Sequence, residues 1–252
     1  MNEQKLALVT GASSELGREL VPRLVQNGTT VIAHYHTDFP SSIFESLSAE
    51  SRNKVTPLRA DFSSQDDVIQ MIETIRGQFG TPQQIVHFPA LNLRYARLSE
   101  FDWESFEVDT HIQLRSLLTL LKAFLPKTGK SSAVETARMK IVLILSSVIL
   151  GMPPKYLAAY TMVKYAQLGL LRAVTAEYAE ENVRIYGVSP SMIETRFVDG
   201  IPTKARELSA LQNPMRRNAT PKDVIPLIEF LLSSNANYIN GCNIPITGGS
   251  IF

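Results

Sequence analysis

An apolar run and a glycine-containing turn open the chain: Leu6-Ala7-Leu8-Val9-Thr10-Gly11-Ala12-Ser13-Ser14-Glu15-Leu16-Gly17. The run predicts a buried strand, and Leu16, Leu20 and Leu24 recur at a four-residue spacing that predicts a helix directly after the turn. A strand that enters a helix through a tight turn directs free backbone N–H groups and the positive end of the helix dipole at one place. The stretch therefore predicts a phosphate-binding turn, although the glycine pair alone is equally consistent with an ordinary strand-to-helix connection.

Short apolar runs alternate with amphipathic segments along the rest of the chain. The runs predict these strands: Leu6–Val9, Val31–Ala33, Val55–Leu58, Ile85–Phe88, Ile141–Leu145, Ile185–Val188 and Asn243–Ile246. They contain little polar alternation, which is typical of strands buried on both faces of a parallel sheet. The intervening segments predict helices, among them Leu16–Gln26, a long apolar helix that ends near Pro126, and Tyr160–Tyr178. We therefore expect an α/β protein with a Rossmann-like, doubly wound parallel sheet of about seven strands, in a single domain over residues 1–252. The polar link Lys127–Met139 is expected to be a surface loop.

The composition excludes several classes of protein. With 25 Lys and Arg against 24 Asp and Glu, the formal charge of +1 gives no reason to expect a nucleic-acid or membrane-surface partner. The single cysteine, Cys242, excludes an internal disulfide, and the four histidines show no metal-ligand spacing. The start of the chain lacks the pattern of a signal peptide, and the longest apolar stretch, Ile141–Leu145, is too short to cross a bilayer. We expect a soluble, cytoplasmic protein without a metal site.

A serine, a tyrosine and a lysine follow in an order that suits carbonyl chemistry. Tyr160 and Lys164 are four residues apart in a predicted helix, so their side chains share one face. Ser147 lies thirteen residues before Tyr160 and just after a predicted strand, and ligands of a doubly wound sheet bind beyond the carboxyl ends of its strands. A carbonyl oxygen that gains charge from a hydride needs a proton, and a nearby ammonium lowers the pKa of a phenol from about 10. The Tyr-x-x-x-Lys pair alone is a weak signal, and its weight comes from its place after the glycine turn and the serine.

These motifs, in this order, resemble those of the short-chain dehydrogenases/reductases. Thr10, Gly11 and Gly17 match the family's T-G-x-x-x-G-x-G, and Glu15 stands in place of the middle glycine. A carboxylate at this position repels a diphosphate if it points inward. The chain is similar to 3-oxoacyl-[acyl-carrier-protein] reductases and to pteridine reductases, which also carry a charged residue here. The resemblance implies a Rossmann-like fold and the NAD(P)-dependent reduction of a carbonyl or related C=N group of a small substrate.

The resemblance also implies the roles of the site residues. Ser147 orients the substrate, Tyr160 is the general acid, and Lys164 assists Tyr160 and binds the nicotinamide ribose. The residues implied to bind the cofactor, besides Tyr160 and Lys164, are Gly11, Ser13, Ser14, Leu16, Gly17, Tyr35, His36, Asp61, Phe62, Pro89, Ala90, Pro190, Ile193 and Thr195. Residues 191–215 are expected to form a flap over the substrate.

Two departures from the family's pattern bear on activity. The family's N-N-A-G after the fourth strand reads His87–Ala90 here. The family also has an asparagine in the long helix, whose backbone binds a proton-relay water. An alignment from the end of that helix puts Gln113 at this position, whereas an alignment from Trp103 puts Thr110 there, and we favour Gln113. These departures leave a second hypothesis open, a nucleotide-binding family member with little or no turnover and a regulatory or assembly role. A sugar epimerase of the extended type is disfavoured, because 252 residues leave little room for its larger substrate region.

The residues after the second strand bear on the choice of cofactor. An NAD enzyme of this fold has an acidic residue near Tyr35 for the ribose 2′-hydroxyl, and none occurs before Asp38. His36 or Thr37 could receive a 2′-phosphate, so we expect NADP rather than NAD. The alternative is that His34 and His36 line a solvated strand end.

Two apolar helical segments predict association between copies of the chain. Gln113–Leu125 and Tyr165–Tyr178 carry more apolar surface than one sheet face needs, and family members pair these helices. We expect a homotetramer or homodimer. Glu180-Glu181 stands where carrier-protein reductases often present a basic residue, which argues mildly against an acyl carrier protein as partner.

Overall fold

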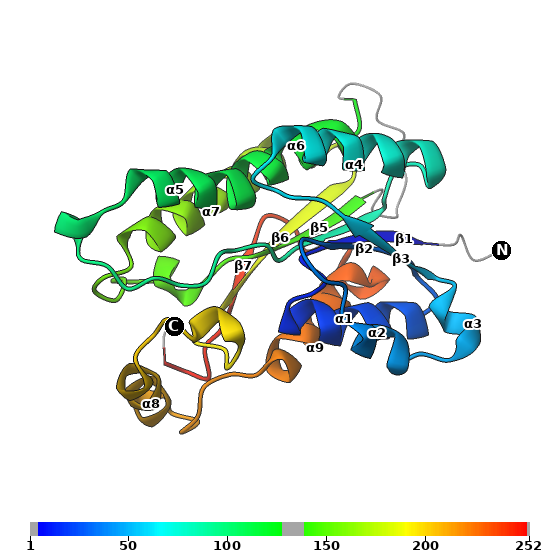
Figure 1. The fold of residues 1–252 in the computed structure, drawn as a ribbon. Helices are drawn as coiled ribbons and strands as arrows, with labels where there is room; N and C mark the ends of the chain where they lie inside the picture. Colours follow the sequence, from blue (N-terminus) through cyan, green and yellow to red (C-terminus); the bar gives the residue numbers. More distant parts are fainter. Residues whose placement is uncertain (1–4, 128–138, 251–252) are drawn as a thin grey trace.

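The computed structural model describes residues 5–127 and 139–250, in which one parallel sheet has helices on both faces (Figure 1). The strands are β1 (Leu6–Thr10), β2 (Thr30–Tyr35), β3 (Val55–Arg59), β4 (Gln84–His87), β5 (Met139–Ile144), β6 (Val183–Pro190) and β7 (Asn243–Ile246). They lie in the order β3-β2-β1-β4-β5-β6-β7, all parallel to their neighbours. The predicted fold class and all seven predicted strands are confirmed, within two residues at most boundaries. The order reverses between β1 and β4, and such a reversal is where ligands bind in doubly wound sheets.

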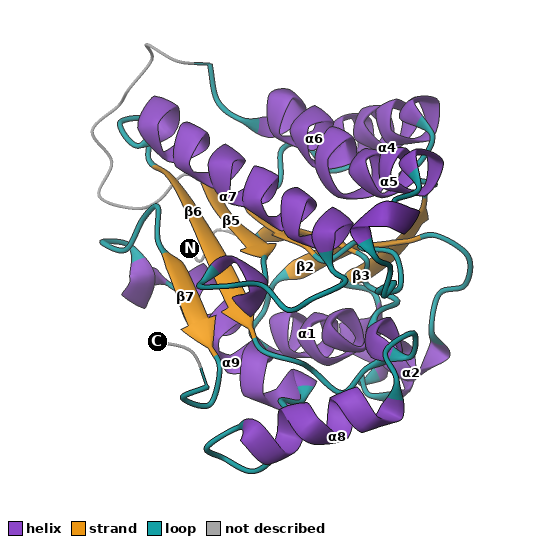
Figure 2. Ribbon diagram, turned by 90° about the vertical axis from the view of Figure 1, so that its left-hand side faces the viewer, coloured by secondary structure: helices purple, strands orange, loops and turns teal. Residues whose placement is uncertain are grey.

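The helices form a layer on each face of the sheet (Figure 2). They are α1 (Glu15–Gln26), α2 (Ser41–Glu45), α3 (Ala49–Arg52), α4 (Gln65–Gln78), α5 (Trp103–Thr110), α6 (Ser116–Phe124), α7 (Ala158–Tyr178), α8 (Thr203–Gln212) and α9 (Pro221–Leu232). Helices α4, α5, α6 and α7 cover one face, and α1, α2 and α9 cover the other. Within the described residues, no helix is both long and apolar enough to span a membrane. Most of the predicted link Lys127–Met139 lies outside the described residues.

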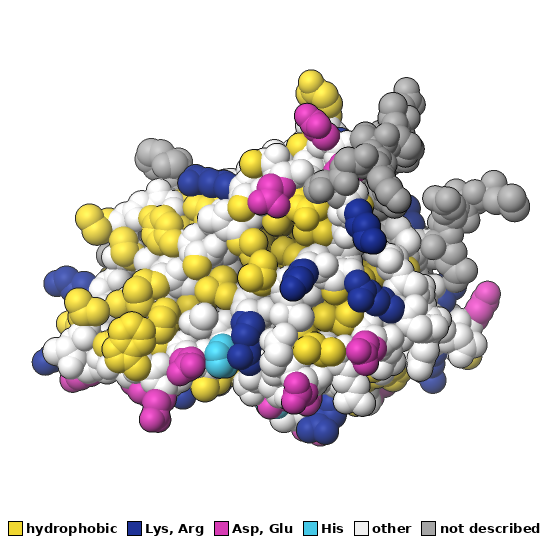
Figure 3. Space-filling model, turned by 90° about the horizontal axis from the view of Figure 1, so that it is seen from above, with side chains coloured by type: hydrophobic (Ala, Val, Ile, Leu, Met, Phe, Trp, Pro, Cys, Tyr) yellow, Lys and Arg dark blue, Asp and Glu magenta, His cyan; other side chains and the backbone are white. Residues whose placement is uncertain are grey.

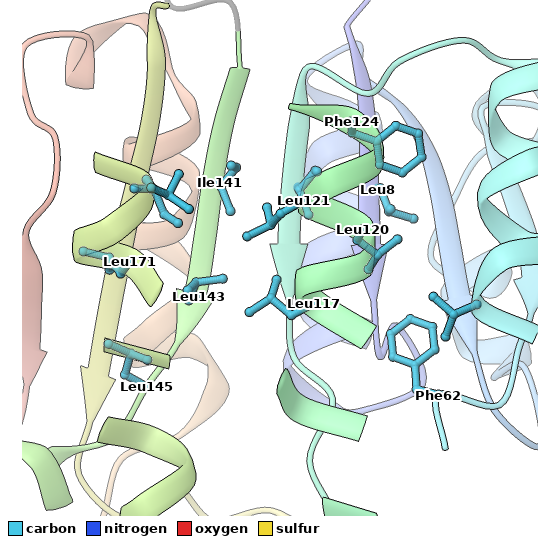
Figure 4. Packing of buried hydrophobic residues seen from close by; sticks show 14 of the residues in the cluster. Leu8, Phe62, Leu117, Leu120, Leu121, Phe124, Ile141, Leu143, Leu145 and Leu171 are labelled. Atoms are coloured by element: carbon cyan, nitrogen blue, oxygen red, sulfur yellow. The ribbon is translucent and has the colours of Figure 1, made fainter. Parts of the chain in front are cut away.

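Alternate residues of β1, β2, β4, β5 and β6 supply two separate cores. Leu8 belongs to the core under α4, α6 and α7, whereas its neighbours Ala7 and Val9 belong to the core under α1 and α9. This follows from the two-residue period of a strand. Figure 4 shows the first core, in which leucines of α6 lie between β1 and β5 beside Ile141 and Leu143.

The long apolar helix predicted to end near Pro126 is interrupted. Helix α5 continues into a π-helix, His111–Arg115, before α6 begins at Ser116. A π-turn accommodates an extra residue in a helix and is frequent at functional sites. Of the two candidates for the family position, Thr110 is the last residue of α5 and Gln113 lies inside the π-helix.

Candidate active site

A cavity of about 950 Å³ opens at the carboxyl ends of the central strands. Its wall comes from the turn after β1, the segments after β4 and β5, helix α7, and the segment between β6 and α9. Most predicted site residues line it: Gly11, Ser13, Ser14, Leu16, His36, Asp61, Phe62, Pro89, Ala90, Ser147, Tyr160, Lys164, Pro190, Ile193 and Thr195.

Three predicted residues lie outside the wall of this cavity. Gly17 lies inside α1, where an added Cβ would be 2.5 Å from the Cα of Ala12, so the glycine permits the helix to pack against the turn. Tyr35 packs against Phe39, with 5.5 Å between the ring centroids. Gln113 is fully buried behind the cavity, in the π-helix.

Backbone conformation and a buried histidine hold the first turn. Gly11 has a φ of +71°, which favours glycine, and its N–H donates to Nδ1 of His34 over 3.1 Å. Because Nδ1 accepts, Nε2 carries the proton and donates to the carbonyl of Ala60 over 3.1 Å. Burial lowers the pKa of His34 to about 4, so the ring stays neutral near pH 7. The alternative that His34 lines a solvated strand end is therefore wrong, because its ring is buried and stacks on Phe62.

Glu15 points across the mouth of the cavity to the opposite wall. Its Oε1 accepts from Nε of Arg196 over 2.8 Å, and 181 positions of sequence separate the two residues. Burial raises the pKa of Glu15, but its hydrogen bonds to Arg196 and to its own N–H outweigh this and leave the pKa below its usual value. The carboxylate is thus paired, and it connects the turn after β1 to the segment 191–215.

Tyr160 and Lys164 lie together on the cavity wall. Nζ of Lys164 is 5.5 Å from the ring centroid of Tyr160, and it donates to the carbonyl of Ile144 over 2.9 Å. Burial lowers the pKa of Lys164 to about 7, and the nearby carboxylate of Asp109 opposes this.

The expected lowering of the tyrosine pKa is wrong for this structure. Burial raises the pKa of Tyr160 to about 12; a hydrogen bond with Ser146 lowers it, and the charge of Asp109 raises it further. The desolvation of the phenol exceeds the stabilisation of a phenolate in this environment. Tyr160 is consequently protonated at neutral pH.

Both serines at the end of β5 reach the cavity. Ser147, the expected substrate-orienting residue, lines the cavity, and the hydroxyl of the neighbouring Ser146 forms a hydrogen bond with Tyr160. The N–H of Val148 also donates to Ser146 Oγ, over 3.4 Å. The only sequence signal for Ser146 is its place beside Ser147.

His87 occupies the position of the first asparagine of the family's N-N-A-G. Its Nδ1 lies 2.9 Å from Oγ1 of Thr10, so it braces β4 against β1. Burial, together with the charge of Lys164, lowers the pKa of His87 to about 3, and the ring is neutral near pH 7.

The comparisons with known proteins extend over nearly the whole chain. A family model described as enoyl-(acyl carrier protein) reductase matches residues 11–250. The chain belongs to the short-chain dehydrogenase/reductase family. It is an NAD(P)-dependent enzyme of this family, similar to 3-oxoacyl-[acyl-carrier-protein] reductases.

The relatives agree on this family and differ in their substrates. The enzyme is 27% identical to the 3-oxoacyl-[acyl-carrier-protein] reductase FabG of Thermotoga maritima, with 99% of this chain and 98% of the relative covered. It is 25% identical to an acetoacetyl-CoA reductase of Allochromatium vinosum, with 97% and 98% covered. A Brucella melitensis 3-ketoacyl-(acyl-carrier-protein) reductase, solved with NADH, has a TM-score of 0.80 at 23% identity, with 98% of each chain covered. At this identity the solved structure supports the fold alone.

The cavity fits a dinucleotide cofactor. It runs without a break from His36 and Asp61, past the glycine turn, to Lys164, and the carboxylate of Glu15 is engaged by Arg196. The N-terminus of α1 adds the positive end of a helix dipole beside the turn. Residues of the turn would hold the diphosphate, and those near β2 and β3 would hold the adenosine.

Proposed function

We propose that the enzyme reduces a carbonyl group of a small substrate, with NADPH as the preferred hydride donor and Tyr160 as the general acid. The observation that carries the proposal is that Tyr160 and Lys164 share one cavity with the glycine turn. A bound nicotinamide cofactor supplies the hydride. The chain's own groups must then bind the substrate oxygen, protonate it and stabilise the phenolate that remains.

The proposed roles follow from the pKa values and positions. Tyr160 is protonated at neutral pH because burial raises its pKa to about 12, so it can donate to a developing alkoxide. The hydroxyls of Ser146 and Ser147 both line the cavity and would hold the substrate oxygen. Lys164, 5.5 Å from the phenol ring, would offset the charge of the phenolate.

The proposed preference for NADPH rests on the end of the cavity near β2 and β3. His36 lines it and is half exposed, and its Nε2 lies 3.7 Å from Oδ2 of Asp61. Nε of Arg59 donates to the carbonyl of His36 over 3.0 Å. The imidazole N–H of His36 and the guanidinium of Arg59 would favour a 2′-phosphate over a hydroxyl.

The segment 191–215 is proposed as the substrate flap. It contributes apolar side chains to the cavity, including Met192, Phe197 and Ile201, and it contains α8, which lies beyond the carboxyl ends of the strands (Figure 1). An apolar or aromatic substrate fits this lining better than a strongly charged one.

The proposed assembly is a homotetramer or homodimer through the helical face formed by α5, α6 and α7. Figure 3 shows hydrophobic side chains gathered on this face, and Trp103 and Leu118 are 72% and 55% exposed. Exposed apolar patches of this kind mark association sites. Light scattering is expected to show more than one chain per particle, and a monomer at all concentrations would contradict the assembly. The cytoplasmic location also stays a prediction.

A titration with NADPH and NADH, followed by a panel of ketones, acyl thioesters and pterins, tests the proposed function. NADPH is expected to bind more tightly and to be oxidised by at least one class of carbonyl. The competing hypothesis, a nucleotide-binding protein with little turnover, is favoured by the costly phenolate of Tyr160 and predicts binding without oxidation on the whole panel.

A further inference from the structure

A chain of buried polar groups runs from Lys164 into the helices behind the cavity. Nζ of Lys164 donates to Oε1 of Gln167 over 2.9 Å, in addition to the carbonyl of Ile144. Nε2 of Gln167 donates to the backbone carbonyl of Gln113 over 3.1 Å. Nε2 of Gln113 donates in turn to Oδ1 of Asp109 over 2.5 Å. The chain therefore connects α7 to the π-helix and to α5.

The neighbours of Gln167 fix the orientation of its amide. An ammonium can only donate, so the amide oxygen faces Lys164, and a backbone carbonyl can only accept, so the amide nitrogen faces Gln113. Gln167 is 1% exposed, and a flipped amide would present its NH₂ group to the ammonium and its oxygen to the carbonyl, so both hydrogen bonds would be lost. The amide thus holds the ammonium at one place.

The π-helix provides the partner on the other side. Gln113 lies in the middle of this helix and is fully buried. The extra residue of a π-turn displaces backbone groups from the regular helical pattern, and here the carbonyl of Gln113 accepts from a side chain of α7. An irregular helix and a buried glutamine on a neighbouring helix therefore meet at one hydrogen bond.

Stability alone gives a poor account of these residues. The other buried side chains on this part of α7 are apolar, namely Val163, Leu168 and Leu171. Oε1 of Gln113 is buried and has no hydrogen-bond partner among the residues that the structure describes. Buried polar and charged groups of this kind are often replaced by apolar residues at no cost in stability.

We propose that Gln167 is a positioning residue for Lys164, held by Gln113 and anchored at its far end by Asp109. This inference rests on the proposed function, because it assigns the amide chain to the ammonium that serves Tyr160. Gln167 keeps the ammonium on the cavity wall and favours its charged form.

The titratable groups around Lys164 come from three elements. Tyr160 faces it from the same helix, Asp109 from α5 and His87 from β4. Tyr160 and His87 are neutral near pH 7, since their pKa values are about 12 and about 3. The carboxylate of Asp109 favours the ammonium, and the folded pKa of Lys164 of about 7 means that the ammonium is lost as the pH rises through neutrality.

The test is the pH dependence of NADPH binding, which is measured by the fluorescence of the cofactor. Two variants are expected to shift this dependence in opposite directions. Gln167→Met removes the acceptor, so the midpoint at which binding weakens with rising pH is expected to fall by about one pH unit. Gln167→Glu adds a negative charge, so the midpoint is expected to rise by about one unit. The kcat/KM profile for reduction should move in the same directions. A residue that only fills space would shift neither midpoint.

Two further variants complete the test. Asp109→Asn keeps an acceptor for Gln113 but removes the charge, so its midpoint is expected to fall, and it serves if a Gln167 variant does not fold. Leu171→Met changes the packing of the same helix face without a polar contact, and its midpoint should match the wild type.

Unchanged midpoints in folded Gln167 and Asp109 variants would overturn the proposal. Binding without turnover in the wild type would instead overturn the proposed function, and the binding midpoints would still decide the role of Gln167.

Discussion

The turn after β1 and the helix pair behind Tyr160 hold the two halves of the same cavity by different means. In the turn, the backbone decides the geometry. Gly11 has a positive φ, and the backbone of Ala12 leaves no space for a Cβ at Gly17. Behind Tyr160, side chains decide it, through a chain of buried hydrogen bonds between α7, the π-helix and α5. The half proposed to bind the nucleotide is therefore encoded locally in the sequence, whereas the half proposed to be catalytic depends on contacts between distant segments.

The largest expected effect is on the catalytic half. Lys164→Met removes the ammonium proposed to offset the phenolate of Tyr160, and kcat/KM for reduction is expected to fall about a hundredfold or more. The exposed Lys122 provides the matched control, and Lys122→Met should keep the wild-type rate. A fall of less than about threefold in Lys164→Met would place the chemistry elsewhere.

The next effect tests the backbone-determined half. In Gly17→Ala the new Cβ would lie 2.5 Å from the backbone of Ala12, so the free energy of unfolding in denaturant is expected to fall by about 2 kcal/mol. Gly77→Ala is the control, because an added Cβ there meets nothing within 4 Å and alanine favours the helix. Equal stability of the two variants would show that the turn tolerates a side chain at Gly17.

A smaller effect is expected at the adenosine end. His36→Ala removes the imidazole proposed to bind the 2′-phosphate, so the ratio of NADPH to NADH affinity is expected to fall about tenfold. His111→Ala changes a histidine outside the cavity wall and should leave the ratio unchanged. Titrations of both variants with both cofactors measure this, and a constant ratio in His36→Ala would assign the preference to other groups.

The smallest effect concerns the ion pair across the mouth of the cavity. Glu15→Gln removes a carboxylate near the diphosphate site, so NADPH is expected to bind a few-fold more tightly. Stability should change by less than about 1 kcal/mol, because Arg196 is largely exposed and such pairs contribute little. Glu19→Gln, one turn along α1 and paired with Arg23, is the control for a general change of charge. Weaker NADPH binding in Glu15→Gln alone would mean that the tie to Arg196 matters more than the repulsion.

The strands and most of the site could be predicted because their signals are local. A buried parallel strand is a short apolar run, and the glycine turn and the Tyr160–Lys164 spacing are each contained within a few residues. The predicted lining residues between Gly11 and Thr195 came together because the strand order places their loops at one edge of the sheet.

The remaining features could not be predicted because they depend on distant partners. The pattern of apolar residues does not distinguish a π-helix from an α-helix. The role proposed for Gln167 depends on its hydrogen bond to Gln113, which lies on another helix and 54 positions earlier in the chain. In the sequence, Lys164 four residues away predicts a lowered pKa for Tyr160. In the folded chain, burial raises this pKa. Likewise, the sequence predicts that the carboxylate of Glu15 could repel a diphosphate, and only the fold shows that Arg196 pairs with it.

Single-turnover oxidation of bound NADPH in the wild type and in Tyr160→Phe tests the central claim most directly. Both proteins are expected to bind NADPH with the same affinity, because the ring is retained and only the hydroxyl is lost. On addition of a carbonyl substrate, the wild type should lose the absorbance of the reduced nicotinamide, and Tyr160→Phe should do so at least about a hundredfold more slowly. Oxidation at the wild-type rate in Tyr160→Phe would contradict the account, because the proton would then come from another group.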